Sequence, residues 1–441
     1  MRDRARARES SRRRGAALLL ALGALAAREA APEERATRTL EECVQIALER
    51  HPRLGSAQAG VEAGRQRVRQ QRAGYLPQLA AGASTQYRKT SPGQATGLPG
   101  GGGSERFGYY TLGLSLSQVL FDFGRNLDAI QAAQARRDSL EADAATEREI
   151  VVRDVKQAYF DLLAARRLLG VAEETLRSNR RQLDEAHGRY EVGFTTKLDV
   201  TRSEVLVANA ELDLLAARNN TRVAEQTLRN ALGLDAPLDF EPLDVLETRR
   251  VEIGEEEALA IALESRPELL SLRAQRSAAQ EDASARWKEH LPEFTGGAST
   301  DWSGSDRLSN TWDLGASVNV PIFSGGLIDA RVGEARANAL ALGFQEEALR
   351  QDVALEVRQA FLEMTRAREA IGVSARVRDQ ARENLELAEG RYRTGVGNVI
   401  ELVDAQAQRA SGEAQYVRSL YGFQIAVADL ERAIGRAVAQ P

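Results

Sequence analysis

One short stretch decides the fold of this chain: IALERHP at residues 46–52, which returns as IALESRP at residues 261–267. A second pair keeps the same offset of 215 residues, with LPQLAAGAST at residues 76–85 and LPEFTGGAST at residues 291–300. Self-similarity at a fixed offset indicates an internal repeat. We therefore interpret the chain as two copies of one structural unit.

The correspondence continues at a new offset further along the chain. Gly124 matches Gly326, and the triplet GRY occurs at residues 188–190 and again at 390–392, an offset of 202. The difference of 13 residues falls before residue 113, where the first copy carries the glycine run 100–103. Extra length confined to a glycine-rich segment predicts a surface loop. The predicted units are a first repeat at 39–236, a linker or equatorial segment at 237–254, and a second repeat at 255–437.

The first residues resemble a targeting segment. Seven arginines precede an apolar run from Gly15 to Ala27, and small residues at 24–26 offer a cleavage site, which predicts a signal peptide at 1–26. The apolar run is shorter than the roughly 20 residues that a membrane anchor needs. Removal of seven arginines and two acids changes the formal charge from −5 to −10, so nucleic acid is not an expected partner. Cys43, the single cysteine, excludes an intramolecular disulfide.

A coiled-coil pattern fills the long proline-free parts of both copies. Apolar or small residues recur at alternating spacings of four and three from Val155 to Tyr190, and again between Val353 and Tyr392. We expect a helix over about 122–192, roughly 105 Å long at 1.5 Å per residue. Two shorter helices, at about 40–75 and 198–232, match that length when they are placed end to end.

Between the helices the apolar period falls to two, which predicts strands. Leu112 and Leu114 alternate with small or polar residues in the first copy, as Leu314 and Val318 do in the second. Each copy therefore contains one hairpin, of a length that suits a tilted membrane strand. The aromatic residues near the loop ends suit contact with outer-membrane lipid; they are Tyr87, Tyr109, Tyr110, Trp302 and Trp312. Two soluble hairpins packed on helices are the alternative.

Four strands per chain cannot close a barrel, and lipid does not tolerate open strand edges. Three chains would supply twelve strands, an even number within the range of bacterial outer-membrane barrels. The predicted fold is therefore mostly α with a small transmembrane β part. Long coiled-coil hairpins accompany four strands per protomer, which complete a trimeric barrel.

The sequence resembles the TolC family of outer-membrane efflux proteins over nearly all of its mature length. The resemblance is carried by the paired Leu-Pro at 76–77 and 291–292, by the strand-to-helix segments 118–125 and 320–326, and by the segments 190–194 and 392–396. It implies a homotrimer in the outer membrane with a helical tunnel, an α-barrel, that spans the periplasm. The implied partners are a periplasmic adaptor (membrane fusion) protein and an inner-membrane pump of RND, ABC or MFS type.

The resemblance also implies roles for particular residues. Gly193 and Gly395 lie between helical patterns, where a tight reversal needs a residue that tolerates positive φ. The resemblance places these turns at the periplasmic tip, in contact with the adaptor; the residues concerned are Val192, Gly193, Phe194, Thr394, Gly395 and Val396.

Glu401 and Asp404 share one helix face, which on pattern alone indicates a solvated surface. The resemblance instead makes them the pore constriction, where six carboxylates in a trimer would favour cations. It also makes Asp199 and Tyr392 closed-state contacts. The sequence departs from the family at Gly397, where an arginine forms a closing salt bridge in the best-known member.

Catalysis is not expected from this sequence. The three histidines lie far apart, and the glycine run 100–103 lacks the Lys-Ser/Thr of a phosphate loop. We expect no cofactor and no metal site. The predicted function is the exit duct of a tripartite efflux pump or type I secretion system. The alternative is an exported periplasmic coiled-coil scaffold or adaptor, which would explain the heptads but not the hairpins.

Overall fold

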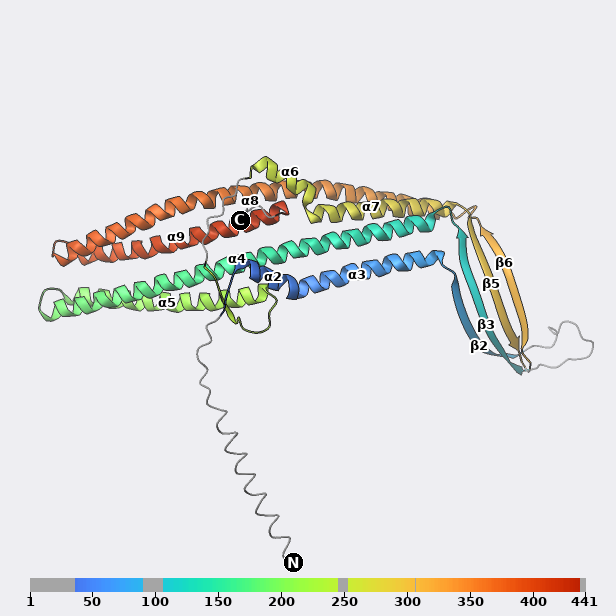
Figure 1. Ribbon diagram of the computed structural model, residues 1–441, viewed down its shortest axis with the longest axis horizontal. Coiled ribbons are helices and arrows are strands. Elements are labelled where there is room, and N and C mark those ends of the chain that lie inside the picture. The colour runs from blue at the N-terminus through green and yellow to red at the C-terminus, as the bar shows by residue number, and fades with distance from the viewer. Residues whose placement is uncertain (1–35, 90–105, 245–252, 306, 437–441) are drawn as a thin grey trace, which may run out of the picture.

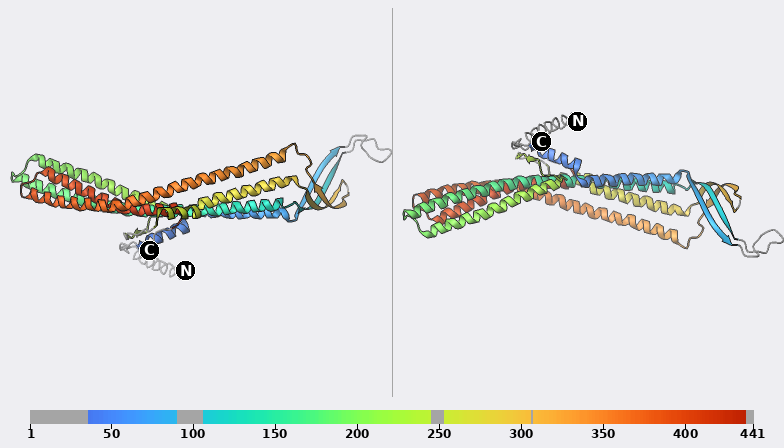
Figure 2. Two further views of the ribbon diagram at one scale, coloured as in Figure 1. Left: turned by 90° about the horizontal axis from the view of Figure 1, so that it is seen from above. Right: turned by 90° about the horizontal axis from the view of Figure 1, so that it is seen from below.

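The computed structural model describes residues 36–89, 106–244, 253–305 and 307–436. The expected signal peptide, the glycine-rich loop and most of the expected linker lie outside these residues. The chain forms an extended helical rod with a sheet at one end, and the three views agree on this shape (Figures 1 and 2). Among the described helices, none carries an apolar stretch long enough to cross a bilayer.

Two long helices run the length of the rod. They are α4 (Arg125–Glu191) and α8 (Leu327–Arg393), each of 67 residues and therefore about 100 Å long. In the half near the sheet they pack against α3 (Pro52–Arg72) and α7 (Pro267–Trp287). In the other half they pack against α5 (Lys197–Ala231) and α9 (Val399–Ile434) (Figure 1). The predicted pairing of one long helix with two stacked short helices is confirmed.

The single helix expected over residues 40–75 is wrong, because the segment breaks at a proline. The structure has α2 (Leu40–Arg50), then α3 beginning at Pro52, and a short 3-10 turn at Ala73–Tyr75. His51 between them is extended, with φ −68° and ψ 124°, since a residue before proline disfavours the helical region. The second copy breaks in the same way between α6 (Glu255–Ser265) and α7.

The four expected strands form one antiparallel sheet in the order β2-β3-β5-β6. They are β2 (Gln78–Lys89), β3 (Arg106–Phe121), β5 (Glu293–Gly304) and β6 (Ser309–Asn319). Leu112 pairs with Trp302 and Leu114 with Thr300, while Gly113 pairs with Asp301 on the opposite face. The predicted alternation is confirmed. Within the described residues, β2 and β6 each have only one paired edge.

A small parallel pair, β1 (Ala36–Arg38) with β4 (Phe240–Pro242), was not foreseen from the sequence. It lies beside the middle of α4, where the Tyr159 hydroxyl donates to the carbonyl oxygens of Arg38 and Leu243 at 3.1 and 2.7 Å. Tyr159 belongs to the apolar core of the first copy. The pair therefore fastens the start and the end of the first repeat to the long helix.

In the second copy a buried arginine, Arg266, stands at the break between α6 and α7, at the position that His51 has in the first copy. Arg266 is 3% exposed; it donates to the carboxylates of Glu268 and Glu356 at 2.9 and 2.6 Å and to the Ala433 carbonyl at 3.2 Å. These bonds tie the break between α6 and α7 to α8 and to the end of α9. Because a buried guanidinium is costly unless it is fully paired, the cluster fixes these helix ends in one arrangement.

Glu149 of α4 lies near this cluster, and its burial raises its pKa to about 7, with a further rise from the Glu268 charge. The folded chain therefore holds a proton that the unfolded chain has released between about pH 4.5 and 7, so stability falls as pH rises through that window. We expect Glu149→Gln to raise the unfolding temperature at pH 8 and to leave it unchanged at pH 4. Circular dichroism melting at both pH values measures this. Glu257→Gln, at an exposed position of α6, is the control; an equal gain at pH 4 and pH 8 would contradict the assignment.

Candidate functional site

The end of the rod away from the sheet consists of two helix-to-helix turns (Figure 1). Gly193 has φ +78° and Gly395 has φ +74°, so both turns use the left-handed region that glycine tolerates, as predicted. The Phe194 amide donates to the Arg189 carbonyl at 2.8 Å, and the Val396 amide donates to the Arg391 carbonyl at 3.0 Å. The two turns are thus closed by equivalent hydrogen bonds.

Apolar side chains project from these turns into solvent. The exposed fractions are 85% for Phe194, 72% for Val396 and 67% for Val192. The single chain therefore presents an apolar surface at the end of each hairpin. An exposed apolar surface of this kind is typical of a protein interaction site.

Gly397 is required by the shape of the second turn. Its amide donates to the Arg391 carbonyl at 2.9 Å. A Cβ atom at this position would lie 3.0 Å from the backbone carbonyl carbon of Arg391 and from the amide nitrogen of Tyr392. An arginine side chain cannot be placed here unless the backbone moves. The departure from the family at this position therefore has a steric reason within this chain.

The two expected constriction carboxylates lie on one exposed face of α9, because Leu402 and Ala405 occupy the buried face. They differ in their surroundings. Arg391 donates through Nε to Glu401 at 3.2 Å, across the turn from α8. Asp404 forms no ion pair with a cation in the part of the chain that the structure describes. Sequence reasoning missed Arg391, although its place ten residues before Glu401 across a tight turn allowed the pair to be foreseen.

The two expected closed-state residues reach the same tip but have separate partners. Asp199 accepts from the hydroxyls of Thr195 and Thr196 at 2.6 and 3.3 Å, at the start of α5 where a negative charge is favoured. Tyr392 is 9% exposed, and the Arg189 guanidinium lies 4.5 Å from the centre of its ring. No hydrogen bond between Asp199 and Tyr392 is recorded among the described residues, so the role of this pair stays a prediction.

The pKa of the Tyr392 hydroxyl is raised above its usual value. Burial raises the pKa of its hydroxyl, the Arg189 charge lowers it, and the Glu185 and Asp199 charges raise it. The phenol is therefore neutral at ordinary pH. In this state it can donate a hydrogen bond, and its ring face can attract a cation.

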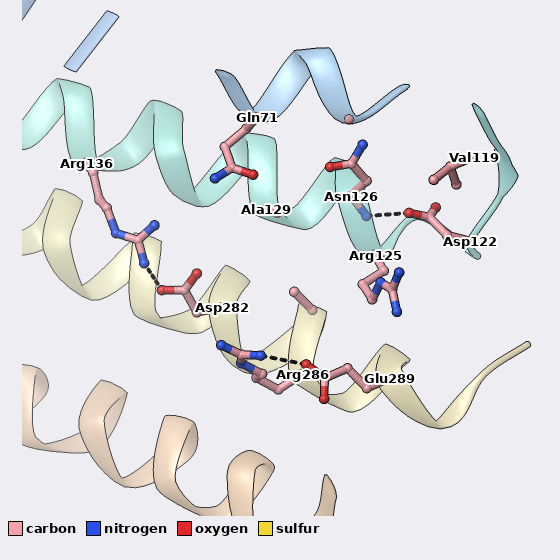
Figure 3. A pocket seen from close by; sticks show the side chains of 12 residues that line it. Gln71, Val119, Asp122, Arg125, Asn126, Ala129, Arg136, Asp282, Arg286 and Glu289 are labelled. Carbon is pink, nitrogen blue, oxygen red and sulfur yellow. Dashed lines mark hydrogen bonds and ion pairs between the residues drawn. The ribbon is translucent and has the colours of Figure 1, made fainter. Parts of the chain in front are cut away.

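A polar cleft of about 480 Å³ lies at the other end of the rod, where α4 and α7 approach the sheet (Figure 3). Its charges are largely paired: Arg136 with Asp282, and Arg286 with Glu289. Asp122 accepts from the main-chain amide of Asn126 at 2.8 Å and so satisfies a donor in the first turn of α4, whose N-cap residue is Gly124. We interpret the cleft as a structural junction between sheet and helices. Within the described ranges, no cluster of His, Cys, Asp and Glu suits a metal ion.

A side chain at position 397 should disturb the second turn. Gly397→Ala forces the backbone of the second turn to move, so the amides of residues 391–399 should exchange hydrogen several-fold faster. Gly390→Ala, where an added Cβ meets no atom within 4 Å, should leave exchange unchanged or slow it, because alanine favours the helix. Hydrogen exchange with mass spectrometry measures both variants. Equal exchange in the two variants would show that the turn tolerates a side chain at 397.

Comparison with known proteins places this geometry in a known group. The sequence profile of the family described as outer membrane efflux protein matches residues 43–234 and 258–436, the two repeats. The chain is 28% identical over 406 residues to the outer membrane protein OprJ of Pseudomonas aeruginosa, covering 90% of this chain and 84% of that protein. It is 24% identical over 402 residues to the outer membrane protein TolC of Escherichia coli, covering 87% and 80%.

Solved structures agree with this match. A membrane protein from Pseudomonas aeruginosa superposes with a TM-score of 0.81 at 26% identity, covering 90% of this chain and 93% of that one. The outer-membrane channel CmeC of Campylobacter jejuni has a TM-score of 0.81 at 19% identity, covering 91% and 86%, and this likeness concerns the fold alone.

Proposed function

Since the chain belongs to the outer membrane efflux protein family and is an outer-membrane efflux channel, we propose that three copies of it form one continuous duct. The sheet of each copy would contribute four strands to a twelve-stranded barrel in the outer membrane. The helices would continue the barrel as an α-helical tunnel through the periplasm. The observation that carries this proposal is the pair of open edges on β2 and β6.

The open edges would be unstable in a single chain in lipid, because the unpaired N–H and C=O groups of the edge strands would have no water to bind. Pairing of β2 with β6 of a second copy would satisfy both edges. Apolar side chains also lie exposed on the helices that would meet. They include Leu340, Phe344, Leu355 and Leu362 on α8, 62%, 70%, 55% and 63% exposed, and Leu198, Leu212 and Leu215 on α5, 58%, 64% and 62% exposed.

The two faces of the sheet suit the two sides of a membrane channel. One face carries exposed apolar residues such as Leu79, Leu314 and Trp312, 72%, 79% and 73% exposed. The opposite face of β3 carries Thr111, Gly113 and further small or polar residues. Outer-membrane barrels have apolar exteriors and polar interiors, which supports this orientation.

At the tip, we assign the apolar turn residues to contact with a periplasmic adaptor protein, which would couple the duct to an inner-membrane pump. The turn residues are Val192, Gly193, Phe194, Thr394, Gly395 and Val396. Glu401 and Asp404 of three copies would form the constriction. Because Arg391 neutralises part of the Glu401 charge, Asp404 would dominate the attraction of cations.

The unequal surroundings of the two carboxylates give the test of this proposal. The protein reconstituted in planar lipid bilayers should form cation-selective channels. Asp404→Asn should lower the ratio of cation to anion permeability more than Glu401→Gln, since Glu401 already has a cationic partner. Asp235→Asn, an exposed acid far from the tip, should leave the ratio unchanged. If the permeability ratio stays at the wild-type value in both Asp404→Asn and Glu401→Gln, these two residues do not form the constriction.

A further inference from the structure

The GRY triplets of the two copies have different surroundings, although the repeat makes them equivalent. Tyr190 is 45% exposed and Tyr392 is 9% exposed. Arg391 pairs with Glu401 inside its own hairpin, α8 with α9. Arg189 instead leaves its hairpin, α4 with α5, and contacts the other one. The two triplets therefore have the same sequence but different contacts.

Arg189 holds Tyr392 by two contacts that do not involve the hydroxyl. Its guanidinium lies 4.5 Å from the ring centre, and Nη1 donates to the main-chain carbonyl oxygen of Tyr392 at 3.4 Å. Nη2 donates to the Glu185 carboxylate at 2.6 Å, one helical turn earlier on α4. Glu185 thus orients the guanidinium, which is 28% exposed.

The other side of the tyrosine ring is fixed by its own hairpin. Tyr392 packs in a buried apolar cluster with Leu385, Ala388, Val399, Leu402 and Ala405. The ring cannot follow Arg189 without disturbing this cluster. Movement of one hairpin away from the other must therefore break the contact rather than carry the ring along.

Among the hydrogen bonds and ion pairs recorded for described residues, the other links between the two hairpins lie far from the tip. Arg153 contacts Asp429 at 2.7 Å and Lys156 contacts Glu431, both near the middle of the rod. The Arg167 guanidinium on α4 also lies 5.9 Å from the ring centre of Tyr421 on α9. Beyond Arg167, about 24 residues or 36 Å of α4 extend toward the tip. A contact at the far end of this unlinked segment therefore has the greatest influence on whether the two tips stay together.

We propose that Arg189 is a positioning residue that latches the two hairpins of one protomer at the tip and holds the channel closed. This inference rests on the proposed channel function. The latch consists of the guanidinium on the Tyr392 ring face and the bond to its main-chain carbonyl. Since the hydroxyl takes no part, phenylalanine at position 392 keeps the latch, which separates it from a lock formed by the Tyr392 hydroxyl with Asp199.

The test measures tip opening in two independent ways on the full chain. Hydrogen exchange of the peptide 385–399 in detergent reports hairpin separation, and resting conductance in planar bilayers reports leakage. We expect Arg189→Ala to speed exchange and to raise the open-to-closed ratio roughly tenfold, as loss of a partly desolvated cation–π contact implies. Tyr392→Phe should resemble the wild type in both. Arg177→Ala is the matched control, because Arg177 is 63% exposed and pairs with Glu174 on its own helix.

Three results would overturn the latch. Wild-type exchange in Arg189→Ala would show that the contact holds nothing. Opening in Tyr392→Phe as large as in Arg189→Ala would assign the lock to the hydroxyl. Hydrogen exchange tests the latch even if the wild-type protein forms no channels in bilayers. Absence of channels would contradict the proposed function and not the latch. A lower melting temperature in Arg189→Ala without faster exchange at the tip would assign Arg189 a general structural role, and it would also overturn the proposal.

Discussion

Backbone groups in a lipid bilayer must find hydrogen-bond partners within protein, and the four-stranded sheet of this chain leaves two strand edges without them. The family assignment locates the chain in the outer membrane, so these edges govern how it assembles. A single chain cannot curl four strands into a closed barrel, and two chains would give eight strands with little lumen. In the proposed assembly, three chains would give a barrel with room for a solute. The helices of each chain would then continue the wall that the strands begin.

Because the sequence unit is duplicated, one pattern of residues produces most of the architecture twice. Two copies supply two hairpins of strand, two helices of 67 residues and two tip turns closed by the same hydrogen bonds. The residues that we assign to channel closure are ones at which the two copies have different contacts. Tyr190 is exposed and Tyr392 is buried; Arg189 crosses between hairpins and Arg391 does not. These differences are concentrated at the tip, where a closed channel needs contacts that can be released.

The elements could be predicted from the sequence wherever one residue type has a strong local effect. Positive φ at Gly193 and Gly395, strand alternation at Leu112 and Leu114, and the long helices all follow from local patterns. The break before Pro52 was missed because the apolar period continues across it. The three-residue strands β1 and β4 are too short to produce a period at all.

The site was harder to predict, because it depends on how two hairpins are rotated against each other. The contact of Arg189 with Tyr392 joins residues 203 positions apart and leaves no periodic signal. The family resemblance identified Tyr392 and paired it with Asp199, and that pairing stays a prediction. In the structure the Asp199 side chain accepts bonds from Thr195 and Thr196 at the start of α5. The steric need for Gly397 likewise becomes visible only when the turn is built.

In the proposed assembly, the open edges of β2 and β6 are closed when three chains form one barrel. The most direct test is the mass of the particle extracted from outer membranes in detergent, measured by size exclusion with light scattering after subtraction of the detergent. We expect the mass of three mature chains. A particle of one or two chains would contradict it, because four or eight strands would then have to satisfy their edges in some other way.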